Sequence, residues 1–296
     1  MKLTQSILSS AEDCQIKAQF TLDPPPWAKR VAGSSRALGT AFHAGLAIRY
    51  ESRMKAEDQS QWLVSGEGLA TGDDMLGAAI EIFRTSQKMD LYDNTPIEVF
   101  KWDDSVPDEA TAETFLAQML AYYMENGHEW PFDWQVLGVE INETLTDARL
   151  GRVKLGADLI LRAPDGGIVS VDHKTGRKPW AAGKADPRKN AQSPFYNRLV
   201  KVRYPGAPYY RFVFDIMVLP RPRAGIVMQR LISDPTEAHE EAIVQRALAF
   251  QQVYETVHVK MGLDLQANPA STLCNPQWCD HFEGCPYGRA LEQPVV

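Results

Sequence analysis

The sequence predicts an α/β fold in which helices flank a central mixed β-sheet. Two observations lead to this prediction. Apolar residues recur at helical spacing through much of the first 130 residues, and the pattern then changes to the alternation typical of strands. Further apolar runs and amphipathic segments follow toward the C-terminus, which is the pattern expected of helices packed on a sheet.

The expected helices of the first half begin at residues 34–58, where apolar residues recur at helical spacing and His43 falls in the middle. Two further helical patterns lie at 73–89 and 108–126, and proline and aspartate residues separate them. We expect these two to form a helical insertion that spans about residues 68–127.

The expected strands follow in the second half. Three successive runs with strand-like alternation are separated by polar or glycine turns and predict an antiparallel meander. A helix, two more apolar runs and a long amphipathic helix complete the chain. In order, these segments are 134–145, 154–163, 166–175, 191–204, 209–220, 225–232 and 236–261.

Composition restricts the class of protein. The 296 residues allow one domain with insertions or two domains, and 44% apolar with 23% charged residues is typical of a soluble globular protein. No apolar run approaches the roughly 18 residues of a membrane span, and the first 20 residues lack the core of a signal peptide. We therefore expect an intracellular, cytoplasmic protein with no membrane partner.

Charge is distributed unevenly along the chain. A net charge of −7 argues against a protein that coats nucleic acid through a broad basic surface. Residues 174–203, however, contain nine basic residues, Arg177 and Lys178 among them, against the single acid Asp186. This basic segment predicts a local anion-binding surface, although a solvated loop and helix face would show the same composition.

The stretch "VDHKTGRKP" places Asp172 and Lys174 at the end of an expected buried strand, where unpaired charges are costly. Asp158, in "GADLIL", lies 14 residues upstream at the start of the preceding strand. A tight hairpin brings the start of one strand beside the end of the next, so both carboxylates can reach one ion. Two carboxylates suit Mg²⁺ or Mn²⁺, and Lys174 points to the same face as Asp172. Taken alone, the Asp-x-Lys pattern is more often a surface ion pair.

The next expected helix adds a second polar pair. Gln192 and Tyr196, in "QSPFY", are spaced four residues apart, so both side chains project from one helical face. By themselves they would be a surface glutamine and a half-buried tyrosine. After the two preceding motifs, they predict a contact with a DNA strand or with a metal-bound water.

Together, "GTAFHAGL", "GADLIL", "VDHKTG" and "QSPFY", between residues 39 and 196, resemble the PD-(D/E)XK nuclease superfamily. The resemblance is to its RecB-like branch, which includes AddB-type nuclease domains and CRISPR-associated exonucleases. It implies a restriction-endonuclease-like core. It also implies metal ligation by Asp158, Asp172 and the His173 carbonyl, with His43 as an additional ligand, Lys174 as the catalytic lysine, and Gln192 and Tyr196 as the signature helix.

Two further residues near these motifs have competing interpretations. A histidine on an apolar helical face is more often a core residue than a ligand, and only the resemblance favours ligation by His43. Glu140, on the strand before Asp158, is a further acid near the expected site, and for it we favour a structural role.

The four cysteines are Cys14, near the start, and Cys274, Cys279 and Cys285, near the end. Three thiols within twelve residues are unusual in an intracellular protein, where metal binding is the usual alternative to disulfides. Four thiolates suit a zinc ion or an iron-sulfur cluster, and ordinary buried thiols are the third interpretation.

The resemblance favours a 4Fe-4S cluster, because iron-sulfur members of this branch carry one cysteine before the nuclease motifs and three after them. Such a cluster would join the two chain ends and make residues 1–296 a single nuclease domain, with a cysteine region at about 270–290. The four-residue gap between Cys274 and Cys279 departs from the commoner two, so a zinc site of three cysteines and His281 stays an alternative.

The resemblance thus implies a Mg²⁺- or Mn²⁺-dependent deoxyribonuclease, with Arg177, Lys178, Gln192 and Tyr196 contacting DNA. We expect an exonuclease acting on single strands or duplex ends in recombination, repair or phage DNA processing. One alternative is a non-catalytic DNA-binding or recombination scaffold. Another is a nuclease module that is active only with a recombination or helicase partner, since the chain has no GxxxxGK[ST] motif of its own.

Overall fold

The computed structural model describes residues 3–28, 30–58, 68–91, 94–221, 225–268, 270–271, 274, 279, 281–282 and 285–289. These residues form two compact units, each assembled from separate stretches of the sequence. The terminal unit comprises Met1–Arg30, Thr144–Lys154 and Thr236–Val296, and the sheet unit comprises Val31–Glu143 and Leu155–Pro235. The expectation that the chain is a single nuclease domain stays a prediction.

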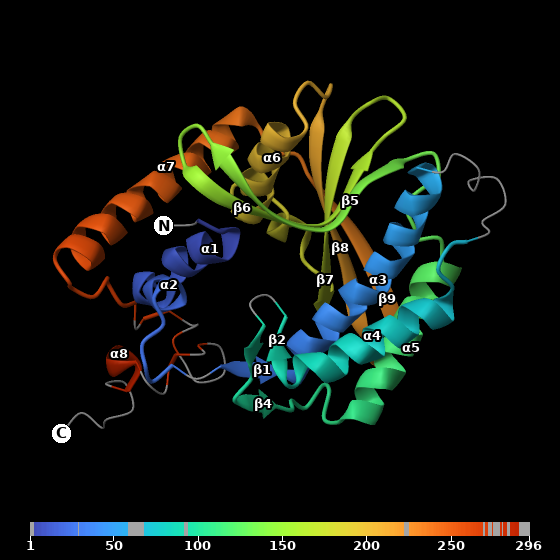
Figure 1. Ribbon diagram of the computed structural model, residues 1–296, viewed down its shortest axis with the longest axis horizontal. Coiled ribbons are helices and arrows are strands. Elements are labelled where there is room, and N and C mark those ends of the chain that lie inside the picture. Colours follow the sequence, from blue (N-terminus) through green and yellow to red (C-terminus); the bar gives the residue numbers. More distant parts are fainter. Residues whose placement is uncertain are drawn as a thin grey trace. The chain divides into compact units, whose positions relative to one another are not determined.

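The sheet unit is built on a five-stranded sheet with the strand order β5-β6-β7-β8-β9 (Figure 1). Strand β7 pairs antiparallel with β6 and parallel with β8, and β8 pairs antiparallel with β9. The α/β class and the mixed sheet are therefore confirmed. The strands are β5 (Gln135–Asp147), β6 (Gly151–Arg162), β7 (Ile168–Gly176), β8 (Tyr210–Arg221) and β9 (Gly225–Ser233).

Strands β6 and β7 separate partway along the sheet. Their register runs from Arg162 opposite Ile168 to Leu159 opposite Val171. Strand β7 continues to pair with β8 as far as Gly176. The next residues after the last β6–β7 pair are Asp158 and Asp172, so these two acids stand where the strands part.

Three helices cover one face of the sheet. They are α3 (Ser34–Asp58), α4 (Gly72–Ser86) and α5 (Glu109–Glu125), and the two latter confirm the helices expected at 73–89 and 108–126. Their apolar side chains form one continuous core with Val169 and Val171 of β7 and Val213 and Met217 of β8. Short strand pairs lie beside these helices, at β1 (Val31–Gly33) with β4 (Val99–Lys101) and β2 (Met89–Asp90) with β3 (Thr95–Pro96).

The opposite face of the sheet carries the alternate residues of β8. Phe212, Phe214 and Ile216 form a second core with Trp180 of the loop after β7 and Tyr196 of α6 (Gln192–Arg203). The period-two alternation of β8 thus supplies both cores, because successive side chains point to opposite faces.

The terminal unit combines helices from both ends of the chain with the turn between β5 and β6. Leu3 forms a bridge with Val153, and Arg246 of the C-terminal helix pairs with Glu12 at 2.7 Å. The helix expected at 236–261 is present as an α-helix that continues into a π-helix. The elements are α1 (Gln5–Asp13), α2 (Gln15–Leu22), α7 (Glu237–Val253), the π-helix η2 (Tyr254–Lys260) and α8 (Pro286–Arg289).

None of the helices in the described part of the chain combines the length and the apolar character that crossing a bilayer requires.

Candidate active site

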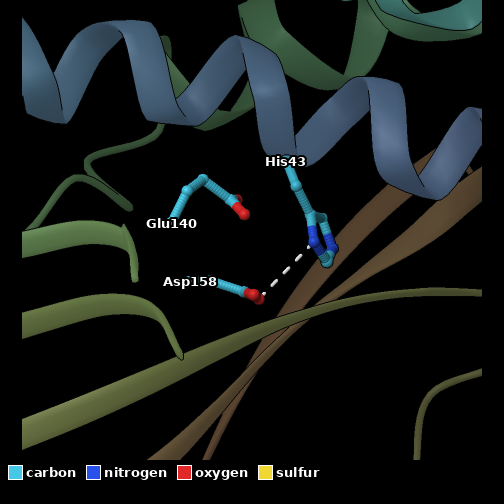
Figure 2. A group of neighbouring side chains, drawn as sticks. All are labelled: His43, Glu140 and Asp158. Atoms are coloured by element: carbon cyan, nitrogen blue, oxygen red, sulfur yellow. Dashed lines mark ion pairs between the residues drawn. The ribbon is translucent and has the colours of Figure 1, made fainter. Parts of the chain in front are cut away.

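Three residues of the sheet unit place potential metal ligands together. His43, Glu140 and Asp158 each offer one ligand atom, and these atoms all lie within 4.8 Å of one another. Figure 2 shows His43 reaching from its helix toward the two acids on the strands, with Nδ1 of His43 3.5 Å from Oδ2 of Asp158. A neutral imidazole and two carboxylates form a donor set that suits a divalent cation.

His43 reaches the site because α3 packs closely on β7. A Cβ atom at Gly39 would lie 2.7 Å from Oγ1 of Thr175, closer than real Cβ contacts. Gly39 and His43 are four residues apart and therefore share one face of the helix. The glycine in "GTAFHAGL" thus allows the approach that carries His43 to the acids.

Glu140 is held by an uncommon backbone conformation. Its φ is +45°, in the left-handed region that residues other than glycine rarely adopt. Nearby, a Cβ at Gly138 would lie 2.3 Å from Cδ1 of Ile141, so any larger residue there would require the Ile141 side chain to move. Such backbone strain concentrates at functional sites. The sequence favoured a structural role for Glu140, whereas the structure brings its carboxyl group to His43 and Asp158.

The acids around Glu140 alter its protonation. Although the residue as a whole is exposed, its carboxyl group faces the other acids. Burial of that group, followed by the charges of Asp158, Asp172 and Glu51, raises the pKa of Glu140 to about 8. A bound cation would oppose this shift and favour the charged carboxylate.

Asp158 occupies the gap between the separated strands. Its Oδ2 accepts a hydrogen bond of 2.7 Å from the backbone N–H of His173. The N–H and C=O of one strand residue point to the same side, so the carbonyl of His173 also faces this gap. Burial is the largest influence on Asp158 and raises its pKa, against the opposing charge of Lys174.

Asp172 is buried and held by two partners. Its Oδ2 lies 2.5 Å from Nζ of Lys174, and its Oδ1 accepts a hydrogen bond of 2.5 Å from Nε2 of Gln192. Burial raises the pKa of Asp172, and the neighbouring Lys174 opposes that shift. Gln192 therefore lies against the carboxylate, whereas its contact with DNA stays a prediction.

Both histidines of the site are neutral at pH 7. Burial, followed by the charge of Lys174, lowers the pKa of His43 from 6.5 to about 4. The His173 side chain is buried beside it, with ring centroids 5.8 Å apart, and burial lowers its pKa well below the usual value. A neutral imidazole keeps the lone pair that metal ligation needs.

The remaining predicted residues lie around this centre. Tyr196 packs on Phe212, with ring centroids 5.9 Å apart, and a Cβ at Gly156 would lie 3.7 Å from its hydroxyl oxygen. Arg177 pairs with Asp103 at 3.1 Å, and Lys178 is exposed. The structure thus places Tyr196 half-buried against the second core and both cations on the surface, and their roles in DNA binding stay predictions.

The four cysteines all belong to the terminal unit. They line one cavity together with Phe20 and His281, and Cys285 is buried in the apolar cluster that Ile16 and Phe20 form. Burial, followed by the charges of the three other cysteines, raises the pKa of Cys274. Across the described residues, however, the only set with ligand atoms within 4.8 Å of one another is the one at His43. The closed cysteine site expected from the sequence is therefore not formed in this part of the chain.

No curated protein sequence matches the chain. Among solved structures, a presumptive exonuclease from Eubacterium rectale matches with a TM-score of 0.46 and 11% identity, covering 100% of this chain and 91% of that one. The protein SSO0001 matches with a TM-score of 0.31 and 14% identity over 95% of each chain. The family model of the PD-(D/E)XK nuclease superfamily matches residues 2–290. The chain belongs to the PD-(D/E)XK nuclease superfamily.

Proposed function

We propose that the protein is a metal-dependent DNA exonuclease that cuts single strands or duplex ends in recombination, repair or phage DNA processing. The observation that carries this proposal is the convergence of Asp158, Asp172 and Lys174 with His43 where two strands separate. An acid–acid–lysine arrangement beside a neutral histidine suits hydrolysis of a phosphodiester with the help of a divalent cation.

The residues that would hold Mg²⁺ or Mn²⁺ are His43, Asp158, Asp172 and the His173 carbonyl, with Glu140 as an additional ligand. The donors fit the group, because carboxylate and carbonyl oxygens suit these cations and the acids already face one another. When bound, the cation supplies Lewis-acid polarisation of the phosphodiester.

Lys174 supplies positive charge beside the carboxylates. Its ammonium group lies 2.5 Å from Asp172 and can donate further hydrogen bonds to an attacking water or to a phosphate oxygen. Gln192 fixes the other oxygen of Asp172, so the acid would present a constant orientation to the cation that it holds. Arg177, Lys178 and Tyr196 would guide the DNA backbone, which needs no base-specific contact.

We further propose that the cysteines hold a 4Fe-4S cluster. The donor set fits, because four thiols from both ends of the chain line one cavity. A tetrahedral zinc ion with Zn–S bonds of about 2.3 Å would draw its sulfurs to about 3.8 Å from one another. Among the described residues no three thiols lie within 4.8 Å of one another, so a zinc ion would have to draw them closer together. Such a cluster would tie Cys14 to the C-terminal cysteines within one nuclease domain.

Cluster chemistry can be tested on the purified protein. A 4Fe-4S cluster predicts a brown preparation that absorbs near ~400 nm with about four irons per chain. A colourless preparation that contains zinc would refute the cluster.

The nuclease is tested by digestion of DNA labelled at its 5′ or 3′ end. Single-stranded and duplex substrates are followed over time with Mg²⁺, Mn²⁺ and EDTA. We expect metal-dependent release of nucleotides from the ends, and its loss in Asp172→Ala and Lys174→Ala variants that keep the wild-type melting profile. Undiminished cleavage by both variants would remove the mechanism, and the absence of cleavage by the wild type would favour a scaffold.

A further inference from the structure

We infer that Lys184 is a second phosphate-binding residue of the active site. It would contact the backbone phosphate next to the scissile one on the strand being cut. This inference rests on the proposed nuclease function and deepens it by assigning a substrate contact to the loop between β7 and α6. Four observations carry it.

First, the sheet anchors this loop. The backbone N–H of Trp180 donates to Oε1 of Gln229 at 2.8 Å, and Nε2 of Gln229 donates back to the Trp180 carbonyl at 2.9 Å. The indole ring packs on Phe214 of β8, with centroids 5.1 Å apart. Trp180 is therefore held in place on the sheet by Gln229 and Phe214.

Second, Lys184 is held over Trp180. Its Nζ lies 4.0 Å from the centroid of the Trp180 ring, within the range of a cation–π interaction. The backbone N–H of Lys184 donates to the Ala181 carbonyl at 2.8 Å. Both contacts already restrict Lys184, so it would lose less conformational entropy on binding a ligand.

Third, a chain of hydrogen bonds ties the loop to the catalytic acid. Nδ2 of Asn190 donates to the Lys184 carbonyl at 3.3 Å, and Oδ1 of Asn190 accepts from the backbone N–H of Gln192 at 2.9 Å. Gln192 in turn donates to Asp172. The position of Lys184 is thus defined relative to the reacting centre.

Fourth, the charge of Lys184 is not neutralised by the protein. Among the described residues, no carboxylate pairs with its ammonium group, whereas the nearby Arg177 and Arg188 pair with Asp103 and Asp186. Burial lowers the pKa of Lys184, and the positive charge of Lys174 lowers it further, which is the direction in which repulsion between two ammonium groups acts. A phosphate anion would relieve this repulsion, and a DNA strand that reaches Lys174 supplies one on either side of the scissile bond.

Lys201 offers a matched control. It too is a lysine over an aromatic ring, with Nζ 5.7 Å from the centroid of Tyr210. Tyr210 lies six residues before Ile216, the strand partner of Lys174. At about 3.3 Å per residue this is about 20 Å along β8, so Lys201 lies far from the centre.

The test measures binding of a fluorescent single-stranded oligonucleotide in Mg²⁺ over a series of salt concentrations. Lys184→Ala, Lys184→Arg and Lys201→Ala are each made in an Asp172→Asn background, which prevents digestion. We expect Lys184→Ala to weaken binding about five- to tenfold and to reduce the slope of log K against log salt by about 0.7, the value for one phosphate contact on a single strand. Lys184→Arg should keep the slope, and Lys201→Ala should not change it.

The same substitutions are then made without Asp172→Asn, and cleavage is measured. Lys184→Ala should raise KM more than it lowers kcat. If the wild type cleaves DNA and Lys184→Ala has the salt slope and KM of Lys201→Ala, the inference about Lys184 fails while the nuclease function stands. If the wild type neither binds nor cleaves DNA with any metal, the proposed function fails and this inference with it.

Discussion

The acid site of the sheet unit and the cysteine cavity of the terminal unit are two candidate metal centres built in different ways. The acid site draws on a long helix and on strands, and the ligand atoms of His43, Glu140 and Asp158 already lie within 4.8 Å of one another. The cysteine cavity takes three of its four thiols from the region after Lys260, where α8 is the only helix or strand in the described residues.

The difference shows how each centre obtains its geometry. Hydrogen bonds from His173 and Gln192 hold Asp158 and Asp172 before any cation arrives, so a cation meets a preformed site. Cys14 lies between α1 and α2, whereas the described residues around the three C-terminal cysteines have little regular structure besides α8, and a cofactor would then supply much of the order there. Loss of the metal should therefore affect activity in the first centre and stability in the second.

The largest effect should follow from Asp158→Asn. This change keeps an oxygen that can accept from the His173 N–H but removes the charge that a cation needs. We expect cleavage to fall by about 10³-fold or more. The melting temperature should stay within a few degrees of the wild type, because the native hydrogen bond is retained. Steady-state cleavage and a thermal melt test this prediction. If the variant lost cleavage because it was unfolded, the idea of a preformed site would be contradicted.

Cys279→Ser should separate the two centres. If the cysteines hold a cluster, this variant should lose iron and absorbance near ~400 nm. It should also melt roughly 6–12 °C lower, the shift for about 3 kcal/mol in a protein of this size. EDTA should do the reverse, stopping cleavage without bleaching the protein. If Cys279→Ser and EDTA treatment each removed both the iron and the cleavage, the two centres would not be independent.

Gly39→Ala should disturb the acid site through packing. The added methyl group would meet Oγ1 of Thr175 and push α3 away from β7. We expect the free energy of unfolding to fall by about 1–3 kcal/mol, with reduced cleavage as His43 moves. Adding Thr175→Ala should restore both. Gly77→Ala in α4, where a Cβ meets no atom within 4 Å, is the control and should stabilise the protein by about 0.5–1 kcal/mol.

Glu140→Gln should weaken the hold on the cation without abolishing the reaction. A neutral amide is a poorer ligand than a carboxylate, so we expect about tenfold lower kcat/KM at limiting Mg²⁺, or about 1.4 kcal/mol. The loss should shrink at saturating Mg²⁺. Glu143→Gln is the control, because Glu143 lies on the same strand and pairs with Arg203. Identical Mg²⁺ titrations for the two variants would exclude Glu140 from the site.

The smallest effect concerns acid stability of the metal-free protein. His43 has a pKa of about 4 in the folded state and 6.5 as its ordinary value, so the unfolded state binds more protons between these limits. Stability that is full above pH 6.5 should be lost as the pH falls to about 4. His43→Gln should reduce this loss by about 1–2 kcal/mol, as measured by denaturant unfolding in EDTA. Parallel curves for the two proteins would show that His43 is not buried in its neutral form.

Much of the sheet unit could be predicted because its elements have a clear period. The helix expected at 34–58 is present with those bounds, and the five strands coincide with the alternating runs. The neighbouring positions of Asp158 on β6 and Asp172 on β7 followed from hairpin geometry, because the start of one strand must lie beside the end of the next.

The placement of Glu140 could not be predicted in this way. Its position depends on a left-handed backbone conformation, which produces no periodic pattern in the sequence. Lys184 likewise depends on Gln229, 45 residues later, which fixes the loop on which it lies. The distances between the thiols could not be predicted from the spacing of the cysteines, because a loop has no regular rise per residue.

The parting of β6 and β7 gives the candidate active site a backbone amide that can report on its occupancy. If β6 and β7 stayed paired, the backbone N–H of His173 would face β6. Where the strands part, it donates to the carboxylate of Asp158 instead. A cation that binds Oδ2 of Asp158 will weaken this hydrogen bond and speed the exchange of the His173 amide proton with solvent. A single amide resonance could therefore follow occupancy of the centre in a protein that is not turning over.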